Sequence, residues 1–235
     1  MTIDAGQRTV DPAAVLFDMD GTLTDSEKLW GIALDDYAAH RGGALSSELR
    51  PQLVGSNMGR TMGLVLADLG LPAGADEIDA GARWVEARAG ELFRDDLPWR
   101  PGAQEALAAV RASGLPTALV TSTIRSLTEI ALETLGRASF EVTVCGDEVD
   151  GKNKPDPEPY LRACRGLGVD PARCVAVEDS PAGASSAGAA GCTVIAVPCE
   201  VPVEPGARRV VRRSLEGFDP AELPALLAGG GAASE

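Results

Sequence analysis

This chain of 235 residues has few aromatic and few basic side chains. Aromatic residues make up 4% of it, so a buried core has to be assembled mainly from Val, Leu and Ala. Lys and Arg number 21 against 35 acidic residues, which gives a formal net charge of −14. Nucleic acids and anionic membrane surfaces are bound by clustered basic residues, so we expect neither as a partner.

Histidine and paired cysteines are also scarce. His40 is the one histidine of the chain, and its five cysteines include no C-x-x-C pair, so the sequence disfavours a zinc site. Cys145, Cys174 and Cys192 lie in or beside apolar runs. Cysteine in such runs usually acts as a small hydrophobic residue, so we expect these thiols to be reduced and buried.

Long hydrophobic runs are missing as well. No apolar stretch approaches the ~20 residues that a membrane span requires. The opening residues MTIDAGQRTVD have neither the basic start nor the apolar segment of a signal peptide. With 45% hydrophobic and 24% charged residues, the composition suits a globular core. We therefore expect a cytoplasmic protein, and a monomer, with no membrane partner.

Short apolar runs predict the strands of a parallel sheet that is covered on both faces. These runs are residues 14–17, 117–120, 141–145, 174–177 and 193–197. Helical segments lie between the later runs, at about 125–135, 157–167 and 181–190. For the last helix we expect Ser180 as N-cap and Pro181 in the first turn. The alternation of strand and helix predicts an α/β fold with a doubly wound parallel sheet.

The spacing between the first two strands is about a hundred residues, far more than a crossover helix needs. Within it, two apolar stripes have helical spacing: Met62, Val65, Leu66 and Leu69, and then Ile78, Ala82, Val85, Ala89 and Leu92. We predict an all-α cap domain at 26–96 inserted into an α/β core formed by 12–25 and 97–220. Polar hinges are expected near Thr24–Asp25 and Leu97–Pro98, and flexible termini at 1–11 and 229–235.

Polar and acidic side chains follow several of the predicted strands. Those after the first, second and fourth strands are Asp18 and Asp20, Thr121 and Ser122, and Glu178 and Asp179. The carboxyl ends of neighbouring parallel strands lie at one edge of an open sheet, so these side chains are expected to converge. Lys154, in the loop GKNKPDP, is the basic residue best placed to join them.

The expected convergence of acids calls for a cation. Two like charges about 4 Å apart repel by roughly 4 kcal/mol at an effective dielectric constant near 20. Mg²⁺, which prefers carboxylate, carbonyl and phosphate oxygens, suits Asp18, Asp20 and Asp179. Asp18 and Asp20 face the same side of an extended segment, so one can attack phosphorus while the other moves the proton of the leaving group. Thr121 offers a hydroxyl and Lys154 a positive charge to the phosphoryl oxygens.

Four motifs, in order along the chain, resemble those of the haloacid dehalogenase superfamily. The signature D-x-D-G-T stands at 18–22, the strand-ending threonine at Thr121, the lysine–proline pair at Lys154–Pro155 and the acidic pair at Glu178–Asp179. The resemblance covers about residues 13–200 and is to phosphatase-like members with a helical cap after the first motif, such as β-phosphoglucomutase and phosphoglycolate phosphatase. One departure is Glu158, where the family usually has aspartate.

This resemblance implies a role for each motif residue. Asp18 would be the nucleophile that becomes an aspartyl-phosphate, and Asp20 the general acid and base. Mg²⁺ would be held by Asp18, the backbone carbonyl of Asp20, and Asp179, with Glu178 either a ligand or a neighbour of the ligands. The implied activity is Mg²⁺-dependent hydrolysis of a small phosphorylated metabolite.

Substrate contacts are expected from both predicted domains. Thr121, Ser122 and Lys154 would bind the phosphoryl group. In the cap, Trp30, Arg60 and the segment Gly55–Thr61 would face the rest of the substrate and select it.

Three other functions share part of this pattern. A sugar phosphomutase is the enzymatic alternative. The mutases of this family resemble each other in having a cap histidine near the position of Trp30, and this chain has no histidine there. A phospho-acceptor domain of the response-regulator type also uses Asp, Lys and Mg²⁺, but needs neither a cap nor Asp20. A dehalogenase requires neither a metal nor a second acid at Asp20. A panel of phosphate esters with Mg²⁺ separates these alternatives.

Overall fold

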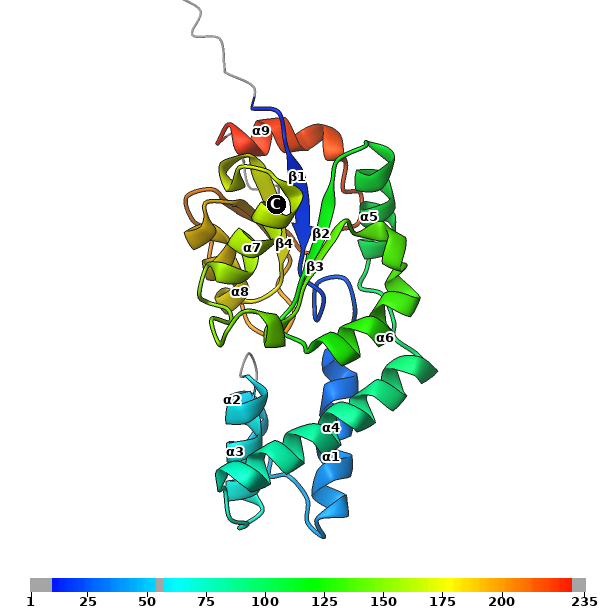
Figure 1. Ribbon diagram of the computed structural model, residues 1–235, viewed down its shortest axis with the longest axis vertical. Helices are drawn as coiled ribbons and strands as arrows, with labels where there is room; N and C mark the ends of the chain where they lie inside the picture. The colour runs from blue at the N-terminus through cyan, green and yellow to red at the C-terminus, as the bar shows by residue number, and fades with distance from the viewer. Residues whose placement is uncertain (1–9, 54–56, 230–235) are drawn as a thin grey trace, which may run out of the picture.

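The computed structural model describes residues 10–53 and 57–229. Within these ranges a six-stranded parallel sheet has the order β3-β2-β1-β4-β5-β6. Figure 1 labels β1 to β4 of this sheet. The strands are β1 (Ala14–Phe17), β2 (Thr117–Val120), β3 (Val142–Val144), β4 (Cys174–Glu178), β5 (Thr193–Ala196) and β6 (Arg209–Val211). The chain adds β2 and β3 on one side of β1 and β4 to β6 on the other, which confirms the doubly wound α/β fold.

The sequence prediction omitted β6. This strand has only three residues, Arg209–Val211, and all of them are partly exposed. Among the described strands β5 is its one neighbour, so β6 lies at the edge of the sheet. An edge strand does not need the continuous apolar run that marks a buried parallel strand, so β6 carries no such signal.

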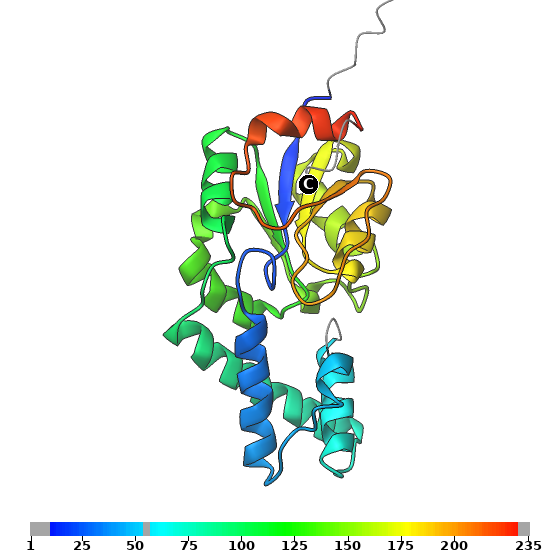
Figure 2. The same cartoon turned by 180° about the vertical axis from the view of Figure 1, so that it is seen from behind.

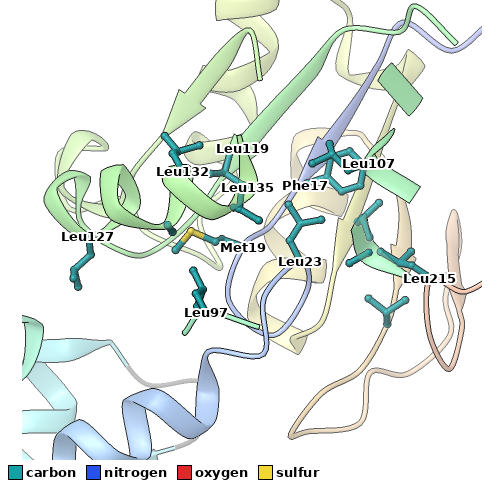
Figure 3. Packing of buried hydrophobic residues seen from close by; sticks show 14 of the residues in the cluster. Phe17, Met19, Leu23, Leu97, Leu107, Leu119, Leu127, Leu132, Leu135 and Leu215 are labelled. Carbon is teal, nitrogen blue, oxygen red and sulfur yellow. The ribbon is translucent and has the colours of Figure 1, made fainter. Parts of the chain in front are cut away.

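Alternate strand residues face opposite sides of the sheet, and helices cover both sides. On one side Val15, Phe17 and Leu119 pack in a cluster with α5 (Ala103–Ala112), α6 (Arg125–Leu135) and α9 (Leu223–Leu227) (Figures 2 and 3). On the other side Ala14 and Leu16 pack with α7 (Glu158–Leu167) and α8 (Pro181–Ala190). This two-sided burial explains the nearly continuous apolar runs of the strands.

The start of α8 has the cap that the sequence predicts. The Ser180 hydroxyl accepts a hydrogen bond from the Gly183 N–H at 3.1 Å, and Pro181 is the first helical residue. The rest of the helix consists of alanine, glycine and serine, and it contacts β4 and β5. Small side chains let the helix approach the sheet closely, so this low-complexity stretch belongs to the core.

Of the five helices described between β1 and β2, the first four form a separate body beyond the carboxyl ends of the strands (Figures 1 and 2). They are α1 (Glu27–His40), α2 (Arg50–Leu53), α3 (Met58–Asp68) and α4 (Ala75–Asp95), and we call residues 27–53 and 57–95 the helical body. The two apolar stripes lie in α4 and in α3 with its C-cap Leu69. Met62, Val65, Leu66, Val85 and Ala89 are buried, and Leu69, Ile78, Ala82 and Leu92 are partly buried.

The two chain crossings between the sheet and the helical body lie side by side. The Asp25 N–H donates to the Pro98 carbonyl at 2.8 Å, and the Arg100 N–H donates to the Leu23 carbonyl at 2.9 Å. Leu23 and Leu97 also pack into the core of the sheet (Figure 3). The two parts are therefore connected by two short segments that are hydrogen-bonded to each other and whose residues Leu23 and Leu97 are packed in the core.

The expectation that Cys145, Cys174 and Cys192 are small hydrophobic core residues agrees with their burial. Cys145, Cys164, Cys174 and Cys192 are buried and free, and Cys199 is free and partly exposed. None of the helices in residues 10–53 and 57–229 is long and apolar enough to cross a membrane. The expectation of flexible termini concerns residues that mostly lie outside the described ranges, as does the part of the Gly55–Thr61 segment before Asn57.

Candidate active site

Asp18 lies directly after β1 and is 5% exposed. Its backbone N–H donates to the Val177 carbonyl of β4 at 3.0 Å, so the hydrogen bonding of the sheet continues to this residue. One carboxylate oxygen, Oδ1, accepts a hydrogen bond from Lys154 Nζ at 2.6 Å. The other, Oδ2, is buried and has no hydrogen-bond partner within the described residues.

Lys154 links three strands at this edge. Its Nζ contacts Asp18 Oδ1 after β1 at 2.6 Å, the Val120 carbonyl of β2 at 2.9 Å, and Glu178 Oε1 of β4 at 2.6 Å. Its side chain is 6% exposed, whereas neighbouring Lys152 is exposed. Burial disfavours the charge, but Asp18 and Glu178 outweigh it and raise the pKa of Lys154 above its ordinary value. The structure thus gives two buried carboxylates one shared ammonium.

Glu178 is fully buried at the end of β4. Its Oε1 accepts hydrogen bonds from Tyr160 at 2.5 Å as well as contacting Lys154. A Cβ at position 183 would lie 1.9 Å from Oε2, so Gly183 of α8 leaves the space that this carboxylate occupies. Sequence reasoning missed Tyr160, because nothing in the pattern of α7 marks it as different from a core residue.

Asp179 completes a cluster of acids. Carboxylate oxygens of Asp18, Glu178 and Asp179 all lie within 4.8 Å of one another. Gly21 has φ +78°, and a Cβ there would lie 2.3 Å from Asp179 Oδ2. The glycine of the D-x-D-G-T motif is therefore required both for the turn and for the close approach of Asp179.

Two acids of this cluster, Asp18 and Asp179, hold their protons more tightly than usual, because they are buried and the one ammonium of Lys154 does not balance three carboxylates. Burial and the neighbouring Glu178 raise the pKa of Asp18 to about 7 against the pull of Lys154. Burial, followed by repulsion from Asp18 and Glu178, raises the pKa of Asp179 to about 9. These carboxylate oxygens, including the unpartnered Asp18 Oδ2, fit the hard oxygen donors that Mg²⁺ prefers.

Asp20 is held differently, by hydrogen bonds from uncharged groups. Its Oδ1 accepts from Ser26 Oγ at 2.7 Å and from Trp30 Nε1 at 3.2 Å. Its Oδ2 accepts from Thr123 Oγ1 at 2.8 Å and from Thr121 Oγ1 at 3.2 Å. Sequence reasoning missed Ser26 and Thr123. Thr123 follows Thr121 by two residues, a spacing that places both side chains on one side of an extended segment and could have indicated it.

The structure brings most of the predicted site residues together and leaves two apart. This group consists of two sets of contacts: Asp18, Lys154, Glu178 and Asp179 form one, and Asp20, Thr121 and Trp30 form the other. Ser122 and Arg60 are exposed, and within the described residues neither side chain makes a hydrogen bond to this group. Arg60 lies in the first turn of α3, in the helical body.

Known proteins resemble this chain over most of its length. A family model described as haloacid dehalogenase-like hydrolase matches residues 12–191. Protein CbbY of Rhodobacter capsulatus is 35% identical over 195 residues, which cover 80% of this chain and 86% of that protein. Hexitol phosphatase A of Escherichia coli is 33% identical over 194 residues, covering 80% and 84%.

The fold comparison agrees with the sequence comparison. The crystal structure of CbbY from Rhodobacter sphaeroides in complex with phosphate superposes with a TM-score of 0.79 and 28% identity, covering 90% of this chain and 99% of that one. The resemblance inferred from the four motifs is thereby confirmed: the chain belongs to the haloacid dehalogenase-like hydrolase family.

Proposed function

We propose that this protein is a Mg²⁺-dependent phosphatase that hydrolyses a small phosphorylated metabolite through an aspartyl-phosphate on Asp18. Membership of the family and its similarity to hexitol phosphatase A and to the phosphoglycolate phosphatase of Chromobacterium violaceum make it a phosphoric monoester hydrolase. The metal and the covalent intermediate are our assignments from the site.

One observation carries the proposal. Lys154 holds Oδ1 of Asp18 at 2.6 Å, while Oδ2 of the same carboxylate is buried without a partner. An orphaned carboxylate oxygen is costly in a folded protein, so its persistence points to a partner supplied by the reaction. That arrangement suits a nucleophile whose Oδ1 is held in place by Lys154 and whose Oδ2 is left to contact the substrate or a cation.

The proposed reaction uses the two aspartates in turn. Asp18 attacks phosphorus, the bond from phosphorus to the ester oxygen breaks, and Asp20 donates a proton to the departing oxygen. Asp20 then takes a proton from water, which attacks the phosphorus of the aspartyl-phosphate and restores the Asp18 carboxylate. Bound Mg²⁺ supplies positive charge to the phosphoryl oxygens and to the surrounding carboxylates.

Asp18, Asp179 and the backbone carbonyl of Asp20 are the proposed metal ligands. Glu178 has a different part in the proposal, because its Oε1 already contacts Lys154 and Tyr160. We assign Glu178 to holding Lys154 beside the phosphoryl group. Thr121 and Ser122 then lie at the end of β2, where hydroxyl and backbone donors suit phosphoryl oxygens.

The helical body is the proposed lid. It lies beyond the carboxyl ends of the strands that carry the aspartates (Figure 1). Both chain crossings pass beside Asp20, because Thr24 forms isolated β-bridges with Asp20 and with Trp99. A small rotation at the paired segments around Asp25 and Pro98 would open or seal the site, and closure would exclude water. We propose that Arg60 faces the substrate from this lid, whereas Trp30, for which the sequence predicts the same place, donates its indole N–H to Asp20. The free cysteines support action in the reducing cytoplasm.

The decisive experiment is a hydrolysis screen of phosphorylated sugars, sugar alcohols and small acids with Mg²⁺. Release of inorganic phosphate, its loss with EDTA and a phosphorylated Asp18 trapped on the wild type support the proposal. Conversion of a sugar phosphate to its isomer without phosphate release would show the mutase alternative, and halide release would show a dehalogenase. A covalently phosphorylated protein that turns over no ester would indicate a phospho-acceptor domain.

A further inference from the structure

Trp30 makes a contact that its expected place at the substrate does not account for. The indole Nε1 lies 3.2 Å from Oδ1 of Asp20 and donates a hydrogen bond to it. Trp30 belongs to the first turn of α1, in the helical body, whereas Asp20 belongs to the loop after β1. This tryptophan therefore connects the two parts of the molecule through the carboxylate assigned as general acid and base.

The ring of Trp30 is fixed by its neighbour in α4. It meets the Phe93 ring edge to face, with centroids 5.9 Å apart and an interplanar angle of 82°. Phe93 is 2% exposed. A ring supported in this way has little freedom to turn, so the direction of its N–H is set by the packing of α1 on α4.

The four donors to Asp20 are not equivalent. Ser26 and Trp30 of the helical side donate to Oδ1, and Thr121 and Thr123 of the sheet donate to Oδ2. A hydroxyl can reverse and accept a hydrogen bond, but an indole N–H can only donate. Trp30 therefore keeps Oδ1 as an acceptor, which leaves Oδ2 as the oxygen that carries the proton in catalysis.

We propose that Trp30 is a positioning residue for Asp20: its N–H fixes the orientation of the carboxylate so that Oδ2 delivers the proton to the leaving group. The inference rests on the proposed function, because it assigns Trp30 a part in the acid–base step. It differs from a substrate contact in what it predicts. A positioning residue affects kcat for leaving groups that need a proton, whereas a substrate contact affects KM.

The kinetic test compares Trp30→Phe with wild type on two substrates. Phenylalanine keeps an aromatic ring against Phe93 and removes the N–H. We expect kcat on the best alkyl phosphate of the screen to fall roughly tenfold, the lower end of the loss for a hydrogen bond to a charged group. Acetyl phosphate, whose leaving group needs no proton, should change by less than about twofold. Equal losses on both, or a raised KM with unchanged kcat, overturn the proposal.

Trp84→Phe is the matched control. Trp84 lies in the same helical body, where it stacks on His40 at 5.1 Å and lies 5.5 Å from the Tyr37 ring. Its replacement removes an indole of the same kind without touching Asp20, so both substrates should be turned over as by wild type. A leaving-group bias in Trp84→Phe equal to that in Trp30→Phe would assign the effect to the packing of the helical body and overturn the proposal.

A spectroscopic test is independent of activity and metal. The chain has three tryptophans, so isotope-labelled protein gives three indole N–H resonances. Asp20→Ala should move one of them strongly, and Trp30→Phe should remove that same one. If all three stay in place in a folded Asp20→Ala protein, the hydrogen bond does not exist in solution and the proposal fails.

Failure of this inference and failure of the proposed function are distinguishable through Asp20→Asn. That variant should show the leaving-group bias in full if Asp20 is the acid, whatever Trp30 does. A bias in Asp20→Asn that is absent from Trp30→Phe overturns the positioning role alone. No bias in either variant overturns the acid–base assignment as well.

Discussion

The carboxyl edge of the sheet and the helical body treat charge in opposite ways. At the sheet, Lys154 and its partners Asp18 and Glu178 have side chains only 6%, 8% and 0% exposed. In the helical body, the ion pair of Arg50 with Asp35 at 2.8 Å has side chains that are 54% and 47% exposed. Exposed pairs contribute little to stability, whereas buried charges are costly unless paired.

This difference suits a division in which the residues at the sheet carry out the proposed reaction and the helical body selects the substrate. The buried ion pairs at the sheet hold charged side chains at fixed positions despite the cost of burying them. Loss of the exposed Arg50–Asp35 pair in the helical body should cost little stability. Ser26, just before α1, and Trp30 are the two residues from that side whose side chains contact Asp20 within the described residues. The predictions below test this division.

The largest effect is expected for Asp18→Asn. An amide cannot form the acyl phosphate, so turnover should fall by ~10⁴-fold or more, the scale on which loss of a nucleophile acts. Phosphate release under saturating substrate measures it, and circular dichroism checks the fold. Retention of more than a few per cent of the wild-type rate would show that Asp18 is not the nucleophile.

Lys154→Met should lower both activity and stability. Loss of one electrostatic stabiliser costs about 10²–10³-fold in kcat, and an unpaired buried carboxylate costs roughly 3–5 kcal/mol in unfolding free energy. Adding Glu178→Gln to Lys154→Met should recover part of the stability, measured by urea unfolding, but none of the activity. Lys152→Met is the exposed control and should match wild type in both. A double variant no more stable than the single one would contradict the pairing.

Mg²⁺ should stabilise the protein more at high pH than at low pH. The pKa values of Asp18 and Asp179 are raised from 3.8 to about 7 and about 9. From pH 3.8 up to about 7 for Asp18 and about 9 for Asp179, the metal-free folded protein binds more protons than the unfolded chain. Its stability therefore falls as the pH rises through these ranges. Mg²⁺ replaces those protons, and its stabilising effect grows as they leave.

Thermal unfolding with and without Mg²⁺ at about pH 6 and about pH 8.5 measures this effect. We expect a larger rise in Tm at the higher pH, and Asp179→Asn should lose most of it. An equal rise at both pH values would place the ion away from these two carboxylates.

The smallest effect is expected for Arg60→Ala. Arg60 is exposed in the helical body, so its loss should leave stability within about 0.5 kcal/mol of wild type. If it faces the substrate when the lid closes, KM should rise several-fold and the order of preferred esters should change, while acetyl phosphate is unaffected. Arg50→Ala, an exposed arginine elsewhere in the helical body, is the control. The same change of preference in both variants would remove the specific role of Arg60.

Much of the architecture could be predicted from the sequence because it depends on local patterns. The strands Ala14–Phe17 and Thr117–Val120 and the helices Arg125–Leu135 and Pro181–Ala190 have the predicted bounds. Continuous apolar runs specify buried parallel strands, and a serine–proline start specifies a helix cap. Asp18 and Lys154, 136 residues apart, could be joined in advance because parallel strands end at one edge of the sheet.

The tertiary structure alone decided how each carboxylate is held. The contact of Glu178 with Lys154 depends on Tyr160 from α7 and on the space left by Gly183 of α8. Whether Trp30 faces the substrate or Asp20 depends on its packing against Phe93. Sequence patterns report which face of an element is buried, but a hydrogen bond depends on the distance and direction between side chains from different elements. That distance and direction are fixed only by the packing of the elements against one another.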